Sequence, residues 1–151
     1  MSEQEALQRE SGGGLASLAL HNLAIVVSDM DAAIEWYGRV LDFRVVAQAE
    51  IAEGEIVLLQ GAGTQLELLH PSRLEEAQVR LDPLFADPPR HVLPIGNKFL
   101  VLQVDDLARA SAELAERSVT FVWRETEKAP GFPATAIRDF DGNLINIMAR
   151  H

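Results

Sequence analysis

The chain has 151 residues, 48% of them hydrophobic and 24% charged, which is enough to build the core of one ordinary domain. Its 13 basic and 23 acidic residues give a net charge of −10, which argues against a phosphate-binding face and against nucleic acid as a partner. It has no cysteine and no apolar run of ~20 residues, so we expect no disulfide, no thiolate metal site, no membrane span and a cytoplasmic location.

The first half of the chain predicts one helix among four strands. Residues 1–17 are polar and contain three consecutive glycines, which is typical of a flexible tail, so a single domain is expected over 18–151. A β-branched apolar run then ends at Ser28 and Asp29, an N-cap pair before a helix with one apolar stripe. The predicted order is strand, helix, strand, strand, strand, at 19–27, 30–41, 43–49, 55–59 and 64–70.

The stretch 71–97 interrupts this pattern because it holds five prolines, so we interpret it as a linker between two halves and a possible lid. A capping box at Ser72 and Glu75 predicts a short helix within it. The second half repeats the earlier order, with an acidic cap at Asp106. Its predicted elements are strand, helix, strand, strand, strand, at 99–104, 107–117, 120–124, 133–138 and 143–149.

Two pairs of short segments indicate an internal duplication. VVSDM at 26–30 matches QVDDL at 103–107, and GTQLELL at 63–69 matches GNLINIM at 142–148. The offset drifts only from 77 to 79. The sequence therefore predicts an α+β fold of two βαβββ repeats, with curved mixed sheets around a central cup that suits a small ligand. The expected boundaries are repeat one at 18–70, the linker at 71–97 and repeat two at 98–150.

The segments LHNLAIVVSDMDAAIEWYGRVLDF, QLELLHP, LQVDDLARASAEL and IRDFDGNLINI resemble the vicinal oxygen chelate superfamily. That group includes glyoxalase I, extradiol dioxygenases, methylmalonyl-CoA epimerase and bleomycin-resistance proteins. The resemblance covers about residues 20–149. It implies a small organic ligand or substrate in the cup and a homodimer.

The resemblance also implies where a metal would bind, at one position in the first strand and one in the last strand of each repeat. These positions hold Asn22, Glu67, Phe99 and Asn146 in this chain. Phenylalanine cannot coordinate, and asparagine offers only a weak neutral oxygen, so we expect no metal and no cofactor. His21 does not replace Asn22, because strand alternation points it to the opposite face.

Two functions remain open from the sequence. The first is a glyoxalase- or bleomycin-resistance-like protein that binds a small organic molecule in a metal-free cup, with Asn22, Glu67, Phe99, Asn146 and Trp123 around it. Its acidity suits a cationic or neutral guest. The alternative is a metal-independent lyase, isomerase or cyclase, with Glu67 as general acid or base and the two asparagines as donors to an oxyanion.

Structural roles for the same residues are also open. Glu67 in a strand of leucines is consistent with an ion pair to an arginine such as Arg138. Asn22 and Asn146 are placed to bond each other across the pseudo-twofold axis. Phe99 and Trp123 are consistent with packing residues.

Overall fold

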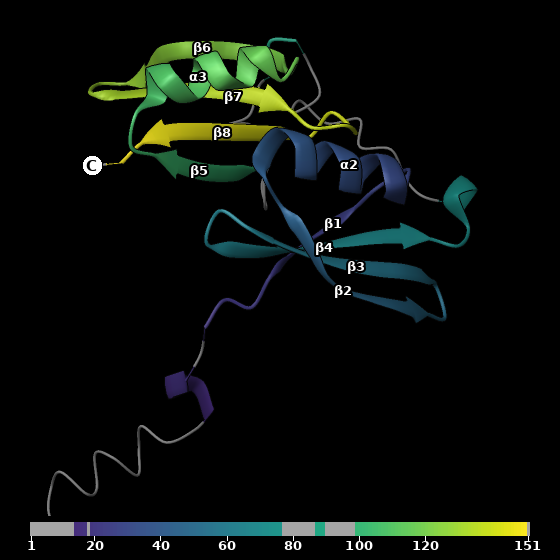
Figure 1. Ribbon diagram of the computed structural model, residues 1–151. Helices are drawn as coiled ribbons and strands as arrows, with labels where there is room; N and C mark the ends of the chain where they lie inside the picture. Colours follow the sequence, from purple (N-terminus) through teal and green to yellow (C-terminus); the bar gives the residue numbers. More distant parts are fainter. Residues whose placement is uncertain (1–13, 18, 77–86, 90–98, 151) are drawn as a thin grey trace, which may run out of the picture.

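A computed structural model describes residues 14–17, 19–76, 87–89 and 99–150, which form two βαβββ modules (Figure 1). Module 1 follows the 3₁₀ turn η1 (Gly14–Ser17) and consists of β1 (Leu23–Val26), α2 (Met30–Leu41), β2 (Arg44–Ile51), β3 (Gly54–Gly61) and β4 (Thr64–Pro71), with the 3₁₀ turn η2 (Leu74–Glu76) after it. Module 2 consists of β5 (Leu100–Val104), α3 (Leu107–Glu116), β6 (Thr120–Ala129), β7 (Phe132–Arg138) and β8 (Leu144–Ala149).

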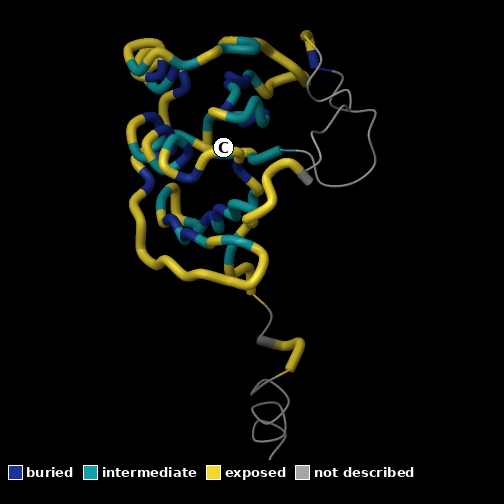
Figure 2. The backbone as a smooth tube through the Cα atoms, turned by 90° about the vertical axis from the view of Figure 1, so that its right-hand side faces the viewer, coloured by how far each residue is buried: buried dark blue, intermediate teal, exposed yellow. Residues whose placement is uncertain are grey.

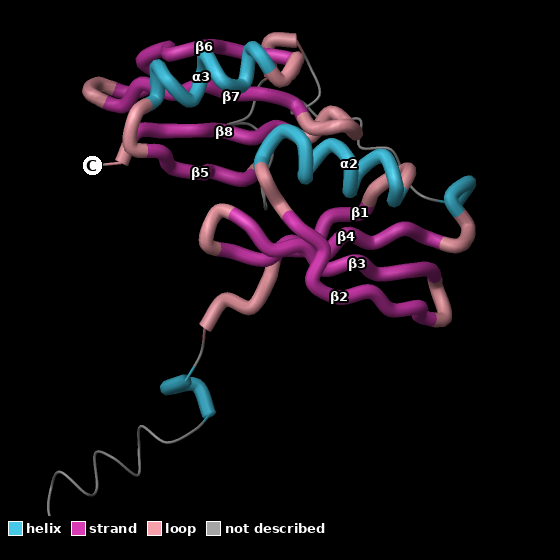
Figure 3. Tube along the Cα trace, viewed as in Figure 1, coloured by secondary structure: helices cyan, strands magenta, loops and turns pink. Residues whose placement is uncertain are grey.

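Each module forms one four-stranded mixed sheet, and the two sheets share the same topology. Sheet A has the order β1-β4-β3-β2 and sheet B the order β5-β8-β7-β6. The first strand runs parallel to the last one in each sheet, and the other pairs are antiparallel. This confirms the predicted α+β fold and its duplication. The sheets do not close on each other (Figure 3).

Both helices begin at the predicted aspartates. The Asp29 carboxylate accepts from the Ala32 backbone N–H at 2.9 Å, and the Asp106 carboxylate accepts from the Arg109 N–H at 3.0 Å. Each bond satisfies an amide that the first helical turn leaves without an intrahelical partner. Among the described residues, no helix is long and apolar enough to span a membrane.

Some boundaries differ from the sequence prediction. The first strand begins at Leu23 rather than at residue 19, and β6 continues to Ala129 rather than ending at 124. β6 continues because its register with β7 shifts at irregularities, one of which holds Glu125 at φ 46°, so the strand bends without ending. Only η2 is described of the short helix predicted after Ser72, and most of the proposed lid lies outside the described residues.

Helix α2 joins the two modules into one core, because it lies between the two sheets (Figure 1). Its buried residues pack in one cluster with side chains from both sheets, including Leu66 and Leu68 of β4 and Ile145 and Ile147 of β8. Figure 2 shows buried segments in the interior of the molecule and exposed segments around them. The two modules therefore fold against a shared hydrophobic interior.

A buried polar contact also crosses between the modules. The Tyr37 hydroxyl of α2 donates to Asp139 Oδ2 at 2.7 Å, and Asp139 is only 7% exposed. The same carboxylate accepts from the backbone N–H of Asp141 and from the backbone and side-chain amides of Asn143. Asp141 in turn accepts from the Ser28 hydroxyl beside α2. The loop between β7 and β8 is thus tied to module 1.

Candidate functional site

The candidate site residues lie in two equivalent rows of register partners, one across each sheet. In sheet A the row is Ala24, Glu67, Leu58 and Ala47, from β1, β4, β3 and β2. In sheet B it is Val101, Asn146, Ala136 and Trp123, from β5, β8, β7 and β6. Register partners in a sheet point to the same face. Glu67 and Asn146 therefore occupy equivalent positions, as the repeat predicted.

We call the faces that carry these rows the open faces, because the helices cover the opposite ones; Ala136 in the sheet B row is nevertheless fully buried. Leu66 and Leu68 flank Glu67 and are fully buried toward the helix side. On the open faces, Val26 at the end of β1 is 58% exposed and Val101 of β5 is 56% exposed. Contiguous apolar side chains at the surface, with polar ones among them, mark ligand or protein contacts.

Asn22 and Glu67 meet on the open face of sheet A. The Asn22 side-chain amide donates to Glu67 Oε2 at 2.8 Å, and both residues are half-buried. The other carboxylate oxygen, Oε1, has no hydrogen bond within the described part of the chain. The pair therefore presents a fixed acceptor oxygen to a ligand.

The open face of sheet B combines an aromatic ring with polar groups. The Lys128 ammonium lies 4.2 Å from the centre of the Trp123 ring, a cation–π contact. Asn146 Oδ1 is buried and has no hydrogen-bond partner among the residues described. Phe99 is half-buried and lies two residues before Val101, just outside β5. The structure thus groups Phe99, Asn146 and Trp123 in module 2, apart from Asn22 and Glu67 in module 1.

These residues do not fit the metal that the superfamily resemblance implies. The carboxylate of Glu67 is bonded to the Asn22 amide, and Phe99 has no donor atom. The described residues contain no group of three or more His, Cys, Asp or Glu side chains that could hold a metal ion. One carboxylate with two amides is a poor donor set for Zn²⁺ or Fe²⁺.

The structure distinguishes between some of the structural roles considered for Glu67 and the two asparagines. Glu67 takes Asn22 as its partner rather than Arg138, whose Nη1 donates to the Gly142 carbonyl at 2.8 Å. Asn22 and Asn146 do not bond each other, because their modules present them on separate sheets. His21 is exposed and offers no substitute for Asn22.

Lys128 was not found by the sequence reasoning. The predicted strand ended at Arg124, which left Lys128 in a loop. The bulge at Glu125 instead carries β6 onward and brings Lys128 over Trp123. The sequence carries no period-two signal for this extension, because residues 124–128 are all polar.

Two βαβββ modules, each with a partly apolar face and a polar residue at the same strand position, define a duplicated α+β fold. The chain belongs to the glyoxalase/bleomycin resistance protein/dioxygenase superfamily, whose family model matches residues 19–147. No curated protein sequence matches the chain.

Solved structures share this fold across nearly the whole chain. A member of the same superfamily from Sphaerobacter thermophilus DSM 20745 is 26% identical, with a TM-score of 0.65, covering 90% of this chain and 100% of its own. TnmS3, an antibiotic binding protein from Streptomyces sp. CB03234, is 22% identical, with a TM-score of 0.62 and coverages of 91% and 100%. UcmS2 is 22% identical, with a TM-score of 0.63 and coverages of 87% and 97%.

Proposed function

We propose that this protein binds a small organic molecule in a metal-free cup and releases it unchanged. The observation that carries the proposal is the Asn22–Glu67 hydrogen bond at a position where metal-bearing relatives hold a metal. An amide there fixes the carboxylate as a hydrogen-bond acceptor, and Glu67 Oε1 is left for a donor on the ligand. The resemblance to an antibiotic binding protein supports the same class of function.

We further propose that the cup is completed by a second copy of the chain. The open faces of sheets A and B belong to separate sheets that share no hydrogen-bonded edge within the described part of the chain. β1 and β5 are edge strands, and each carries an exposed valine, Val26 or Val101. Unpaired edges with apolar side chains favour association, and closed twofold dimers are the commonest outcome. Module 1 of one copy then faces module 2 of the other.

The ligand contacts follow from this arrangement. Asn22 and Glu67 of one copy supply polar contacts, while Phe99, Asn146 and Trp123 of the other supply ring surface and an amide. Trp123 with Lys128 offers an aromatic face beside a positive charge, which suits a planar group. A cup with few polar groups on an apolar lining is the usual form of a small-molecule site.

The binding role is tested with Glu67→Gln, which keeps the shape of the side chain and removes its charge. Native mass spectrometry of the protein with a metabolite extract would identify the ligand, and calorimetry would give its affinity. We expect the affinity of Glu67→Gln to fall about tenfold or more, because a hydrogen bond to a charged acceptor contributes about 1.5–3 kcal/mol. Glu53→Gln, which makes the same change at an exposed position in the turn between β2 and β3, is the matched control. If the native protein converts the ligand and Glu67→Gln does not, the protein is instead an enzyme that uses Glu67.

The shared cup is tested by mixing two variants that each bind the ligand weakly. Glu67→Gln and Trp123→Ala each damage every cup when they form homodimers. After exchange of subunits, a mixed dimer contains one cup with both substitutions and one with neither, because each cup takes one module from each copy. We expect binding to reappear in the mixture. Mixtures that stay as weak as the separate variants would contradict the shared cup.

A further inference from the structure

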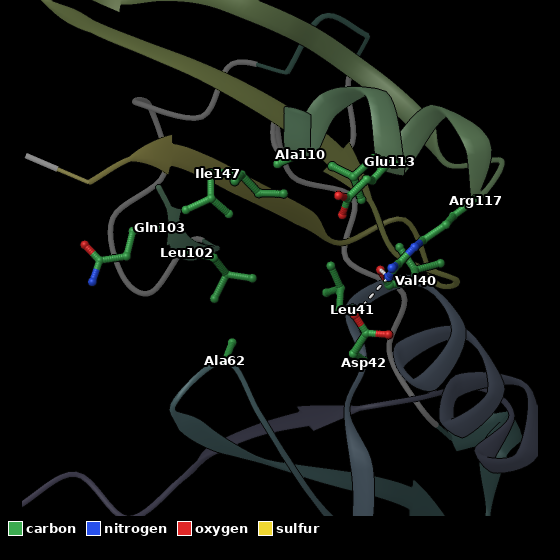
Figure 4. Close-up of a pocket in the computed structure, with 12 residues that line it drawn as sticks. Val40, Leu41, Asp42, Ala62, Leu102, Gln103, Ala110, Glu113, Arg117 and Ile147 are labelled. Atoms are coloured by element: carbon green, nitrogen blue, oxygen red, sulfur yellow. Dashed lines mark hydrogen bonds and ion pairs between the residues drawn. The ribbon is translucent and has the colours of Figure 1, made fainter. Parts of the chain in front are cut away.

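A pocket lies between the two modules, lined by residues of α2, α3, β5 and β8 (Figure 4). Leu102, Ala110 and Ile147 of module 2 converge there on a space bordered by Leu41 and Ala62 of module 1. We propose that this pocket is a second ligand site, which takes a single-ring apolar molecule carrying an amine. It goes beyond the cup and does not depend on it.

The walls of the pocket are held together by an arginine. Arg117, at the end of α3, donates from Nη1 to the Val40 carbonyl at 2.8 Å and to Asp42 Oδ2 at 3.1 Å. Arg39 of α2 donates in return to the Arg117 carbonyl at 2.7 Å. These bonds connect the ends of both helices, so the pocket does not need to be assembled by its ligand. Such preorganisation reduces the loss of entropy on binding.

The size of the pocket selects the ligand. Its volume is about 160 Å³, whereas pockets for drug-sized molecules measure roughly 300–1,000 Å³. Apolar cavities of about 150 Å³ accept benzene and stay dry without it. Leu102 and Ala110 are only half-buried, so part of their apolar surface stays in contact with water. One ring is therefore the group that fits and that removes this surface from water.

The charges at the mouth favour an amine. Asp42 and Glu113 both line the pocket, and the positive charge of Arg117 is already engaged with Asp42. Among the described residues, Glu113 is paired only with Arg109 of its own helix, at 3.3 Å between two exposed side chains. Such exposed pairs are weak and exchange readily. An ammonium group attached to the ring can therefore bind Glu113, whereas a carboxylate would be repelled.

The two sites use different side chains of the same strands. Leu102 and Ile147 face the pocket, while their chain neighbours Val101 and Asn146 belong to the open face of sheet B. Gln103, on the same face of β5 as Val101, also lines the pocket, so the pocket reaches the edge of this strand. A variant that disrupts the cup leaves the pocket residues unchanged. An experiment that rejects the cup therefore does not reject the pocket.

Benzylamine is the probe for the pocket, titrated into the native protein and followed by the amide signals of two-dimensional NMR. We expect saturable shifts at Leu102, Ala110 and Ile147. Ala110→Leu adds three carbons to the pocket wall and is expected to weaken binding about tenfold or more. Ala108→Leu makes the same change at an exposed position of α3 and should leave binding unchanged. Melting curves of both variants confirm that the fold is kept.

Three outcomes overturn the proposal. The first is the absence of saturable shifts with the native protein, and the second is equal affinity in Ala110→Leu and Ala108→Leu. The third is a smaller mass in solution for Ala110→Leu, which would show that a second copy covers this face. The amine is tested with two related probes. We expect benzyl alcohol to bind about two- to fivefold more weakly than benzylamine, and benzoate to bind more weakly than benzyl alcohol. Benzoate binding as tightly as benzylamine would reject the charge assignment.

A final variant separates this site from the cup. Glu113→Gln should reduce benzylamine to the affinity of benzyl alcohol, whereas Glu67→Gln should leave benzylamine binding unchanged. Loss of benzylamine binding in Glu67→Gln would place the probe in the cup and overturn the second site. If Glu113→Gln binds benzylamine as tightly as the native protein does, the proposed contact between the amine and Glu113 is wrong.

Discussion

Tyr37 is the only tyrosine of the chain, and its hydroxyl is buried against a carboxylate. Burial raises the pKa of Tyr37 far above its usual value of 10, and the charge of Asp139, the bond to it and the charge of Asp141 add to this. The proton of the phenol is therefore held more tightly in the folded protein than in the unfolded chain. Stability from this group is complete below about pH 10 and is lost as the pH rises further.

The raised pKa of Tyr37 predicts how the protein responds to alkali. In the native protein we expect the ultraviolet absorbance of tyrosinate to appear only when the protein unfolds. Circular dichroism measures the unfolding in the same samples. Tyr37→Phe removes the bond to a buried carboxylate and should lower the free energy of unfolding near neutral pH by about 1.5–3 kcal/mol. Its stability should also decline less than that of the native protein above pH 10. Tyrosinate absorbance in the folded native protein near pH 10 would contradict the burial argument.

Strand β6 is shaped by one hydroxyl at the bulge that directs Trp123. Thr135 of β7 is fully buried, and its Oγ1 accepts from the Glu125 backbone N–H at 3.0 Å. The same oxygen lies 2.7 Å from the Ser111 hydroxyl of α3. One side chain thus connects the bulge, the sheet and the helix. Because the backbone of Glu125 has φ 46°, an orientation that few residues adopt, this bond helps to hold it there.

We predict that Thr135→Val, which keeps the shape of the side chain, destabilises the protein by about 1–3 kcal/mol, because a buried hydroxyl and an amide lose their partner. Urea unfolding measures the loss, and Trp123 fluorescence in a Trp36→Phe background reports whether the indole moves. Thr120→Val, at an exposed position in the neighbouring strand β6, serves as the control and should change stability by less than about 0.5 kcal/mol. Equal effects of the two variants would show that the bulge does not rely on this bond.

At the scale of the whole molecule, the modules are joined by the shared core and by the bonds of Arg117. Arg117→Met should lower the free energy of unfolding by about 1–2 kcal/mol, since it removes a bond to a half-buried carbonyl and one to Asp42. Hydrogen exchange should increase at the end of α2 more than elsewhere. Arg109→Met removes only a surface pair within α3 and should have an effect below about 0.5 kcal/mol. Similar exchange rates in both variants would argue against a latch between modules.

The association of two copies gives a second prediction at this scale. Val26→Lys places a charge in an exposed apolar position at the end of β1 and should weaken the dimer, because burying an unpaired charge is unfavourable. Light scattering at micromolar concentration should then give the mass of one chain, 16.6 kDa, instead of twice that mass. Leu74→Lys, which alters an apolar residue that is 42% exposed outside both sheets, should keep the dimer. A native protein with the mass of one chain would reject the shared cup at once.

Much of the fold was predictable from local patterns. The acidic caps Asp29 and Asp106, the helical stripes behind them and the glycine turns before the last strands recur at nearly constant spacing. These signals are local, because caps and periodicity depend on residues within a few positions of each other. The equivalence of Glu67 and Asn146 also followed from this spacing, and the register of both sheets confirms it.

The sequence by itself therefore determined the duplicated α+β fold and the identity of the residues at the equivalent strand positions. Only the tertiary structure decided which residues meet: Glu67 bonds Asn22 rather than Arg138, Tyr37 bonds Asp139 across the modules, and Lys128 lies over Trp123. These contacts join residues that lie apart in the chain or follow from a bulge. They depend on how α2 packs between two sheets and on how β6 twists, which no local pattern of residues specifies.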